Sequence, residues 1–351
     1  MRRIVRAYFV AGMLLAVGNA WAQEESVYVI PKFTFEAGGV LDNMKVGYVT
    51  FGKLNAAKDN AILVIPGASG NRHSSDTLIG PGKTFDTDKY FVIGLDPIGG
   101  GNSSSPKDGL GTAFPKYNIR DMVRVQHEFI TKGLGLTGLY AVAGPSLGSF
   151  QGIEWGVTYP GFMKGLILWV PAARSDRQIH AIVDAVTAVI ALDAAYKGGA
   201  YTENPVEGIK RAGMVYFPWL FSEEYLDGLV KDEDFDKAKV AFGEGWAKVW
   251  DANSMLTRYA AARTHDVSIP YGGDTRKALA RVTAKVLVMP SMTDRTVPIS
   301  LAREMYRGLP NAIWQEIPSI KGHLACCQPP GTAEYAYVSE RTKAFLDSLT
   351  N

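Results

Sequence analysis

The stretch Gly144-Pro145-Ser146-Leu147-Gly148 follows the apolar run 139–143 and precedes a segment of helical character. A short apolar run bounded by glycine predicts a buried strand, so the serine is expected on a tight turn between a strand and a helix. The backbone of such a turn is strained and crowded, which explains why the residues two positions either side of the serine are glycine. The stretch therefore predicts a serine hydroxyl that projects above the end of a sheet.

An acid and a histidine follow the serine, each at the end of a later predicted strand. Asp294 comes after the apolar run 284–290, and His323 comes after the run 312–317. A serine hydroxyl needs an imidazole base beside it, and the imidazole needs a carboxylate that fixes its tautomer. The chain order serine, acid, histidine is typical of the α/β-hydrolase fold. We predict that Ser146, His323 and Asp294 form a catalytic triad.

Other residues are candidates for the acid and the base of the triad. Asp176 follows the predicted strand 166–170, and some proteins of this fold draw the acid from that earlier position. For Asp294 the alternative is a turn-forming aspartate. The remaining histidines are expected to be surface or core residues, because none lies beyond the last predicted strand; they are His73, His127, His180 and His265.

The rest of the pattern predicts the fold class. Runs of strand type at 44–51, 61–65 and 90–95 alternate with amphipathic segments such as 118–132. This alternation is typical of a mainly parallel central sheet flanked by helices. Residues 174–275 have helical periodicity and many aromatic side chains but no convincing strand, so we expect them to form a helical cap inserted over the site. Residues 23–351 are then a single α/β-hydrolase domain.

The first 22 residues have the pattern of a signal peptide. Arg2, Arg3 and Arg6 precede the short apolar stretch 7–17, and Ala20-Trp21-Ala22 gives a small-x-small cleavage site. The apolar stretch is too short to span a bilayer and no cysteine follows the cleavage site, so no stable membrane anchor is expected. These features predict a periplasmic or secreted protein.

Composition excludes several functions. Lys and Arg total 37 against 35 for Asp and Glu, which gives no electrostatic basis for nucleic-acid binding. The glycine-rich run 99–105 lacks the Gly-Lys-Ser/Thr ending of a phosphate-binding loop, so we predict no cofactor and interpret the run as a wall of the active-site mouth.

Cys326 and Cys327 are the only cysteines in the sequence. No second pair of cysteines or histidines stands at the spacing of metal ligands, so no metal site is predicted. We expect the two cysteines to be small, largely buried residues that line the loop behind His323, although export would permit a vicinal disulfide between them, and their redox state stays open.

A second glycine-rich stretch has a predicted role in catalysis. Residues 66–70 follow the strand 61–65, at the position where this fold supplies one backbone N–H of its oxyanion hole. The other N–H comes from the residue after the serine, Leu147.

Several segments, in the same order, are similar to the homoserine O-acetyltransferase family, and the resemblance covers nearly all of the mature chain. The matching stretches are 79–83, 86–93, 151–160, 198–201 and 251–254. The resemblance implies the same triad, with oxyanion donors at Ala68 and Leu147.

The departures from that family concern the substrate. Aligned on the stretch 198–201, Thr187 stands where the family has an arginine, and Leu324 stands where an aspartate follows the catalytic histidine. The family's two charged recognition groups are therefore missing, and homoserine is not expected as substrate because its charges would be poorly compensated. We expect Thr187, Tyr201 and Leu324 to contribute to substrate binding.

Three functions remain open at this point. The first is an exported serine hydrolase that cleaves a small-molecule acyl ester of modest polarity through an acyl-serine intermediate. The second is an O-acyltransferase with a different acceptor, although acetyl-CoA is not expected outside the cytoplasm. The third is a binding protein that has kept the fold without catalysis. The aromatic cap helices could also form a homodimer.

Overall fold

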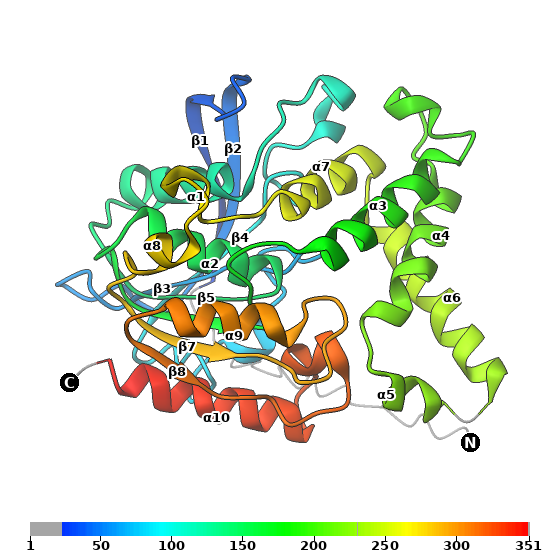
Figure 1. Cartoon of the computed structure of the whole chain (residues 1–351). Helices are drawn as coiled ribbons and strands as arrows, with labels where there is room; N and C mark the ends of the chain where they lie inside the picture. Colours follow the sequence, from blue (N-terminus) through cyan, green and yellow to red (C-terminus); the bar gives the residue numbers. More distant parts are fainter. Residues whose placement is uncertain (1–22, 230, 350–351) are drawn as a thin grey trace, which may run out of the picture.

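The computed structural model describes residues 23–229 and 231–349 (Figure 1). The predicted signal peptide, residues 1–22, lies outside the described residues. The strands form one eight-stranded sheet with the order β1-β2-β4-β3-β5-β6-β7-β8. Their bounds are β1 (Glu24–Thr34), β2 (Val40–Phe51), β3 (Ala61–Val64), β4 (Phe91–Leu95), β5 (Leu139–Pro145), β6 (Met163–Trp169), β7 (Lys285–Met289) and β8 (Ala312–Trp314).

Most of the sheet is parallel. Strand β1 pairs with β2, and β2 with β4, in antiparallel fashion, whereas every pair from β4 through β3 to β8 is parallel. The predicted α/β-hydrolase architecture is therefore confirmed for the central sheet. Strand β1 was missed by the sequence prediction because most of its side chains are exposed, so it has no buried apolar run.

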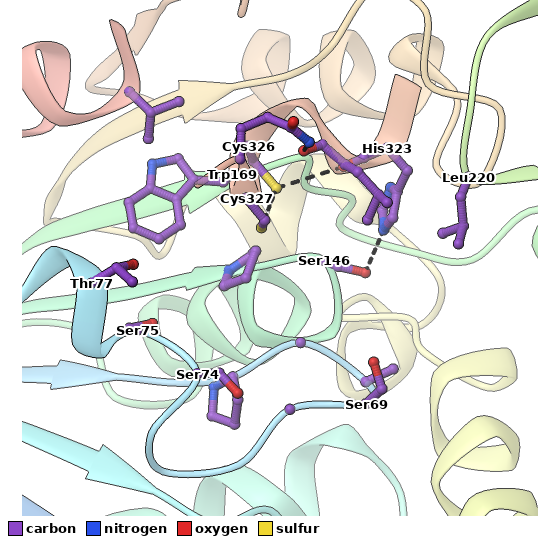
Figure 2. A pocket seen from close by; sticks show the side chains of 18 of the residues that line it. Ser69, Ser74, Ser75, Thr77, Ser146, Trp169, Leu220, His323, Cys326 and Cys327 are labelled. Atoms are coloured by element: carbon purple, nitrogen blue, oxygen red, sulfur yellow. Dashed lines mark hydrogen bonds between the residues drawn. The ribbon is translucent and has the colours of Figure 1, made fainter. Parts of the chain in front are cut away.

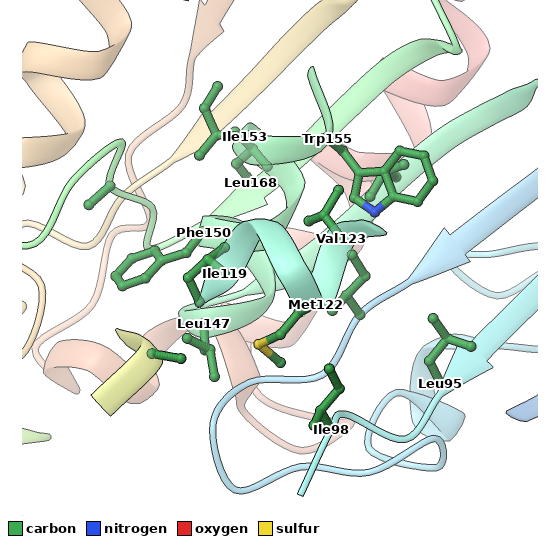
Figure 3. Packing of buried hydrophobic residues seen from close by; sticks show 14 of the residues in the cluster. Leu95, Ile98, Ile119, Met122, Val123, Leu147, Phe150, Ile153, Trp155 and Leu168 are labelled. Atoms are coloured by element: carbon green, nitrogen blue, oxygen red, sulfur yellow. The ribbon is translucent and has the colours of Figure 1, made fainter. Parts of the chain in front are cut away.

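The inner parallel strands β4, β3, β5, β6 and β7 are buried on both faces, and their side chains contribute to two different apolar clusters, whereas the edge strand β8 is half-buried. In β6, Leu166 and Leu168 pack in one cluster while Ile167 and Trp169 pack in the other. The first cluster lies beneath α1 (Ile119–Glu128) and α2 (Leu147–Thr158), and Figure 3 shows residues of both helices in this cluster together with Leu168. The second lies beneath α10 (Ala333–Asp347). Two further helices are α8 (Thr275–Leu279) and α9 (Ile299–Gly308).

The segment between β6 and α8 is a helical insertion, which we call the cap. Its α-helices are α3 (Arg177–Ala191), α4 (Val206–Tyr216), α5 (Glu223–Asp227), α6 (Asp232–Val249) and α7 (Ala252–Arg263). In the described part of 174–275 there is no strand, only one isolated bridge between Arg174 and Asp266. This bridge brings together the two ends of the cap, which stands beside the sheet in Figure 1. No helix within the described ranges is long and apolar enough to cross a bilayer.

The turn between β5 and α2 is as crowded as the sequence predicted. Ser146 has φ 53° and ψ −121°, and its N–H donates to the carbonyl of Trp169 at 2.9 Å. A Cβ on Gly144 would lie 2.6 Å from the carbonyl oxygen of Ile65. A Cβ on Gly148 would contact the same oxygen and lie 2.9 Å from that of Pro66. Both glycines are therefore required by the close approach of the turn to the chain after β3.

Substitution of Gly148 by alanine should lower the free energy of unfolding by about 1–3 kcal/mol, because the backbone carbonyls cannot move away cheaply. Urea unfolding followed by circular dichroism measures this change. Gly245→Ala is the matched control, since Gly245 also lies in a helix but has open space around its Cβ position. The control should be neutral or stabilised by up to about 1 kcal/mol through helix propensity. Equal stability of the two variants would contradict the steric explanation.

Candidate active site

Ser146, His323 and Asp294 lie in a continuous hydrogen-bonded line. His323 Nε2 is 2.8 Å from Ser146 Oγ, and His323 Nδ1 is 2.7 Å from Asp294 Oδ2 (Figure 2 shows the serine and the histidine). The side chains of His323 and Asp294 are almost fully buried. A serine hydroxyl, an imidazole and a buried carboxylate in this order have the geometry of nucleophile, general base and orienting acid.

The loop that follows β7 fixes the orientation of the Asp294 carboxylate. Its Oδ1 accepts hydrogen bonds from the backbone N–H groups of Thr296 and Val297, both at 2.8 Å. The other oxygen, Oδ2, is left to face His323. Because backbone N–H groups can only donate, Oδ1 must remain an acceptor, and the carboxylate cannot rotate freely.

His323 is held by the cap as well as by its own turn. It lies in the 3₁₀ turn η8 (Gly322–Cys327), and its N–H donates to the carbonyl of Leu220 in the cap at 2.8 Å. Gly322 has φ 59°, and a Cβ there would lie 2.6 Å from the Leu220 carbonyl oxygen. Glycine at position 322 therefore allows the cap to approach the base closely.

Two threonines join the acid loop to its neighbours. Thr293 Oγ1 donates to the carbonyl of Ser319 at 3.0 Å and accepts from the N–H of Gly322 at 3.2 Å. Thr296 Oγ1 donates to the carbonyl of Trp219 in the cap at 2.8 Å. The loops of acid and base and the cap segment 219–222 thus form one hydrogen-bonded unit.

The two predicted oxyanion donors lie at the serine. Leu147 is the first residue of α2, and Ala68 lies on the loop after β3 that packs against the turn. Neither backbone N–H donates a hydrogen bond to another described residue. Both residues line a small cavity that also includes Ser146. Two free donors beside a nucleophile can stabilise a developing oxyanion.

Arg258 of α7 supports the loop that carries Ala68. Its Nη1 donates to the Ala68 carbonyl at 2.6 Å and its Nε donates to the Ile98 carbonyl at 3.3 Å. The guanidinium lies 4.7 Å from the centre of the Trp250 ring, and burial lowers the pKa of Arg258. No pattern in the sequence points to this residue, because a single arginine in an amphipathic helix is usually exposed.

Ser146 stands between two cavities. The larger, about 330 Å³, is bounded by the chain after β3, by His323 and the end of η8, and by the cap residues Leu220, Phe242 and Trp246. The smaller, about 40 Å³, is lined mainly by apolar side chains of α2 and α3, including Phe150, Ile179 and Val183. Tyr216 and Tyr259 line both cavities. Burial raises the pKa of each of these phenols, so both are neutral at ordinary pH.

Of the three residues expected to bind substrate, only Leu324 lines a cavity. Thr187 lies on α3, half-buried, and contributes to neither cavity beside Ser146. Tyr201 also lies outside both, because its hydroxyl donates to Asp251 at 2.6 Å and accepts from the N–H of Asn253 at 2.9 Å. These two hydrogen bonds hold the Tyr201 side chain against the first turn of α7. Thr187 and Tyr201 therefore lie outside the two cavities beside Ser146, and a role for them in substrate binding stays a prediction.

The alternative acid is excluded by its position. Asp176 precedes α3 and its carboxylate accepts from the N–H of Ile179 at 2.9 Å, which is the arrangement of a helix N-cap.

The other histidines have local partners instead of a serine. His265 is buried against the Phe150 ring, and burial lowers its pKa to about 4; the remaining contacts are His127 with Tyr159, His73 with Asp76, and His180 with Arg177.

The glycine-rich run 99–105 does not form the wall that the sequence suggested. Gly99, Gly100 and Gly101 line a separate cavity of about 110 Å³, which touches the larger one only through Ser69 and Gly70. Ser103 and Ser104 are buried, and their hydroxyls accept hydrogen bonds from backbone N–H groups of β2.

Within the described ranges no group of three or more histidine, cysteine or acidic side chains is placed to hold a metal ion.

Comparisons with known proteins agree with this fold. Residues 60–326 match the family described as alpha/beta hydrolase fold. The chain is 31% identical over 306 residues to a homoserine O-acetyltransferase of Methanohalophilus mahii, with 79% of this chain and 63% of that protein covered. It is 30% identical over 325 residues to that of Leptospira biflexa, with 83% and 85% covered. The solved structure of an acetylester hydrolase from Corynebacterium glutamicum superposes with a TM-score of 0.86 at 27% identity, with 92% of this chain and 96% of that chain covered.

Substitution of Asp294 by asparagine should reduce kcat by roughly ten-thousandfold, as expected when the histidine is held in the wrong tautomer. The side-chain oxygen must still accept from Thr296 and Val297, so the amide NH₂ would face His323 Nδ1. Steady-state kinetics on an activated ester would measure the loss. Asp176→Asn should keep nearly full activity, because asparagine is also a good N-cap. The reverse result would move the acid to Asp176.

Proposed function

Because the chain belongs to the homoserine O-acetyltransferase-like family of α/β hydrolases, we propose that it is a serine esterase that cleaves a small, uncharged acyl ester through an acyl-serine intermediate. Its relatives include both acetyltransferases and an acetylester hydrolase, so the family alone leaves the acyl acceptor undecided. The choice between hydrolysis and transfer has to come from the site.

The observation that carries the proposal is the absence of charge around Ser146. No Asp, Glu, Lys or Arg is among the described residues that line the larger or the smaller cavity. An amino-acid zwitterion bound there would lose its hydration without gaining an ionic partner, which costs several kcal/mol. Leu324, directly after His323, presents a hydrocarbon side chain to the larger cavity. A neutral ester fits these walls better than homoserine does.

The geometry supports a two-step reaction. Ser146 Oγ attacks the ester carbonyl while His323 Nε2, 2.8 Å away, takes the hydroxyl proton. Asp294 stabilises the imidazolium, and the N–H groups of Ala68 and Leu147 hold the oxyanion. His323 then returns the proton to the leaving alcohol, which leaves an acyl group on Ser146. Water, deprotonated by His323, releases the acid and restores the serine.

The size of the cavities supports a short acyl group. The oxyanion donors Ala68 and Leu147 both line the smaller cavity, which at about 40 Å³ has room for only a few carbon atoms. The larger cavity has serine and threonine side chains along the chain after β3 and suits the alcohol. A preference for acetyl-type esters is consistent with the similarity to the superposed acetylester hydrolase. Transfer to an alcohol other than homoserine is the second candidate, favoured by the sequence similarity to the homoserine O-acetyltransferases.

The proposal also includes export. The arginine, apolar and small-residue pattern of residues 1–22 supports a periplasmic or secreted location, where water is the abundant acyl acceptor. A homodimer formed through the cap helices stays a prediction.

Both reactions should be measured on one preparation of the mature protein. We expect nitrophenyl acetate to be hydrolysed at least about tenfold more efficiently than nitrophenyl hexanoate, because the longer chain overfills the smaller cavity. Acetyl transfer from acetyl-CoA to homoserine should be negligible. The Ser146→Ala variant should lose hydrolysis and labelling by a fluorophosphonate probe. Efficient homoserine acetylation with weak ester hydrolysis would refute the esterase, and undiminished labelling of the variant would refute the nucleophile.

Export has its own measurement. N-terminal sequencing of protein recovered from the periplasm or medium of the expressing cells should begin at Gln23. Recovery of the chain from the cytoplasm with Met1 or Arg2 at its terminus would contradict the signal peptide and make acetyl-CoA available as donor.

A further inference from the structure

Two adjacent cysteines form part of the wall beside the catalytic histidine. Cys326 and Cys327 are the last residues of η8, the turn that begins with Gly322 and His323. Both line the larger cavity, and Figure 2 shows their sulfur atoms facing each other. Cys326 is buried and Cys327 is exposed. The proposed reaction uses neither thiol.

We propose that Cys326 and Cys327 are the site of a vicinal disulfide that closes this wall of the catalytic cavity. Their Sγ atoms are 2.7 Å apart, which is closer than two unbonded sulfur atoms normally approach. A disulfide bond has a length of about 2.0 Å, so only a small further movement of the two side chains forms it. No other cysteine occurs in the sequence, so each sulfur has only this intramolecular partner.

The bond forms by two thiol–disulfide exchanges with an oxidised small-molecule or protein disulfide. The Cys327 thiolate attacks one sulfur of the oxidant, which becomes bound to Cys327 Sγ in a mixed disulfide, while the other sulfur of the oxidant leaves as a thiol. The Cys326 thiolate then attacks Cys327 Sγ, which forms the vicinal disulfide and releases the remaining oxidant sulfur as a second thiol. The dithiol loses two protons and two electrons, and the oxidant is reduced to two thiols. Cys327 is suited to attack first because it is exposed, whereas contact with Cys327 and burial raise the pKa of Cys326.

This disulfide should be easy to reduce. Adjacent residues joined by a trans peptide have Cα atoms about 3.8 Å apart, whereas ordinary disulfides span about 4.4–6.8 Å. The described peptide bonds are all trans, so the ring has to accommodate the shorter span. Strained and exposed disulfides are the reducible, regulatory ones, in contrast to structural disulfides. An oxidising compartment would favour the closed form, which agrees with the proposed export.

The closed ring would act on the substrate cavity through the turn η8. Cys326 Sγ lies 3.6 Å from the carbonyl oxygen of His323, and Cys327 lines the larger cavity. The ring would therefore fix the side chains of both cysteines at the wall beside Leu324. When the bond is reduced, this restraint is lost and the Cys327 side chain is free to change its rotamer within the cavity. This functional consequence rests on the proposed esterase activity, whereas formation of the bond does not.

Intact-mass measurement tests the bond itself. The mature protein should be incubated with oxidised glutathione, denatured, and treated with iodoacetamide, with a parallel sample reduced by dithiothreitol first. We expect no alkylation and a mass lower by two hydrogen atoms without reduction, and two alkylated cysteines per chain after it. Two alkylated cysteines in both samples, a stable glutathione adduct, or dimers that disappear on reduction would overturn the proposal, whether or not the protein is an esterase.

Kinetics tests the consequence for the cavity. Reduction of the wild-type protein should raise KM for a short ester by roughly threefold and change kcat less, since the wall moves while the triad stays in place. Cys327→Ser and Cys326→Ser cannot form the bond, so their KM should not respond to dithiothreitol. A response of either variant equal to that of the wild type would overturn the link between the bond and substrate binding.

Discussion

The close approach of the serine turn to the chain after β3 is the constraint on which the site depends. Gly144 and Gly148 let the turn reach the carbonyl oxygens of Ile65 and Pro66, where a single Cβ would overlap. This contact places Ser146 beside the loop that carries Ala68, so that nucleophile and oxyanion donors share one cavity. The positive φ of Ser146 is the local cost of this arrangement, and the parallel strands on either side hold it in place.

The position of the base, His323, depends on a different region of the chain, the cap. His323 donates its backbone N–H to Leu220, and Thr296 of the acid loop donates to Trp219, so the cap segment 219–222 connects the two loops. The cap is thus part of the catalytic framework as well as a cover for the cavities. Since Leu220 also lines the larger cavity, one residue contacts both the substrate space and the backbone of the base. Substitutions in the cap segment 219–222 would therefore change the position of His323.

Charge is distributed unevenly around the site. The cavities beside Ser146 have no charged lining residue, yet Arg258 lies buried just behind the oxyanion loop and binds the Ala68 carbonyl. A cation at that position supports the loop without offering a partner to a bound carboxylate, because Arg258 lines neither of the two cavities beside Ser146. The vicinal cysteines add a neutral wall whose shape depends on their redox state. The chain therefore combines the α/β-hydrolase framework with cavities beside the serine that have no charged lining residue.

The sequence by itself determined the sheet strands with apolar runs, the turn at Ser146, and the order of Ser146, Asp294 and His323, because each depends on local pattern and chain order. It missed β1, whose exposed side chains give no pattern, and it could not show that Thr187 and Tyr201 lie outside both cavities beside Ser146, because their positions depend on how the cap packs. Arg258 and the hydrogen bonds of segment 219–222 were also invisible. Their partners lie far away in the chain, so only the packing of the cap against the sheet brings them together.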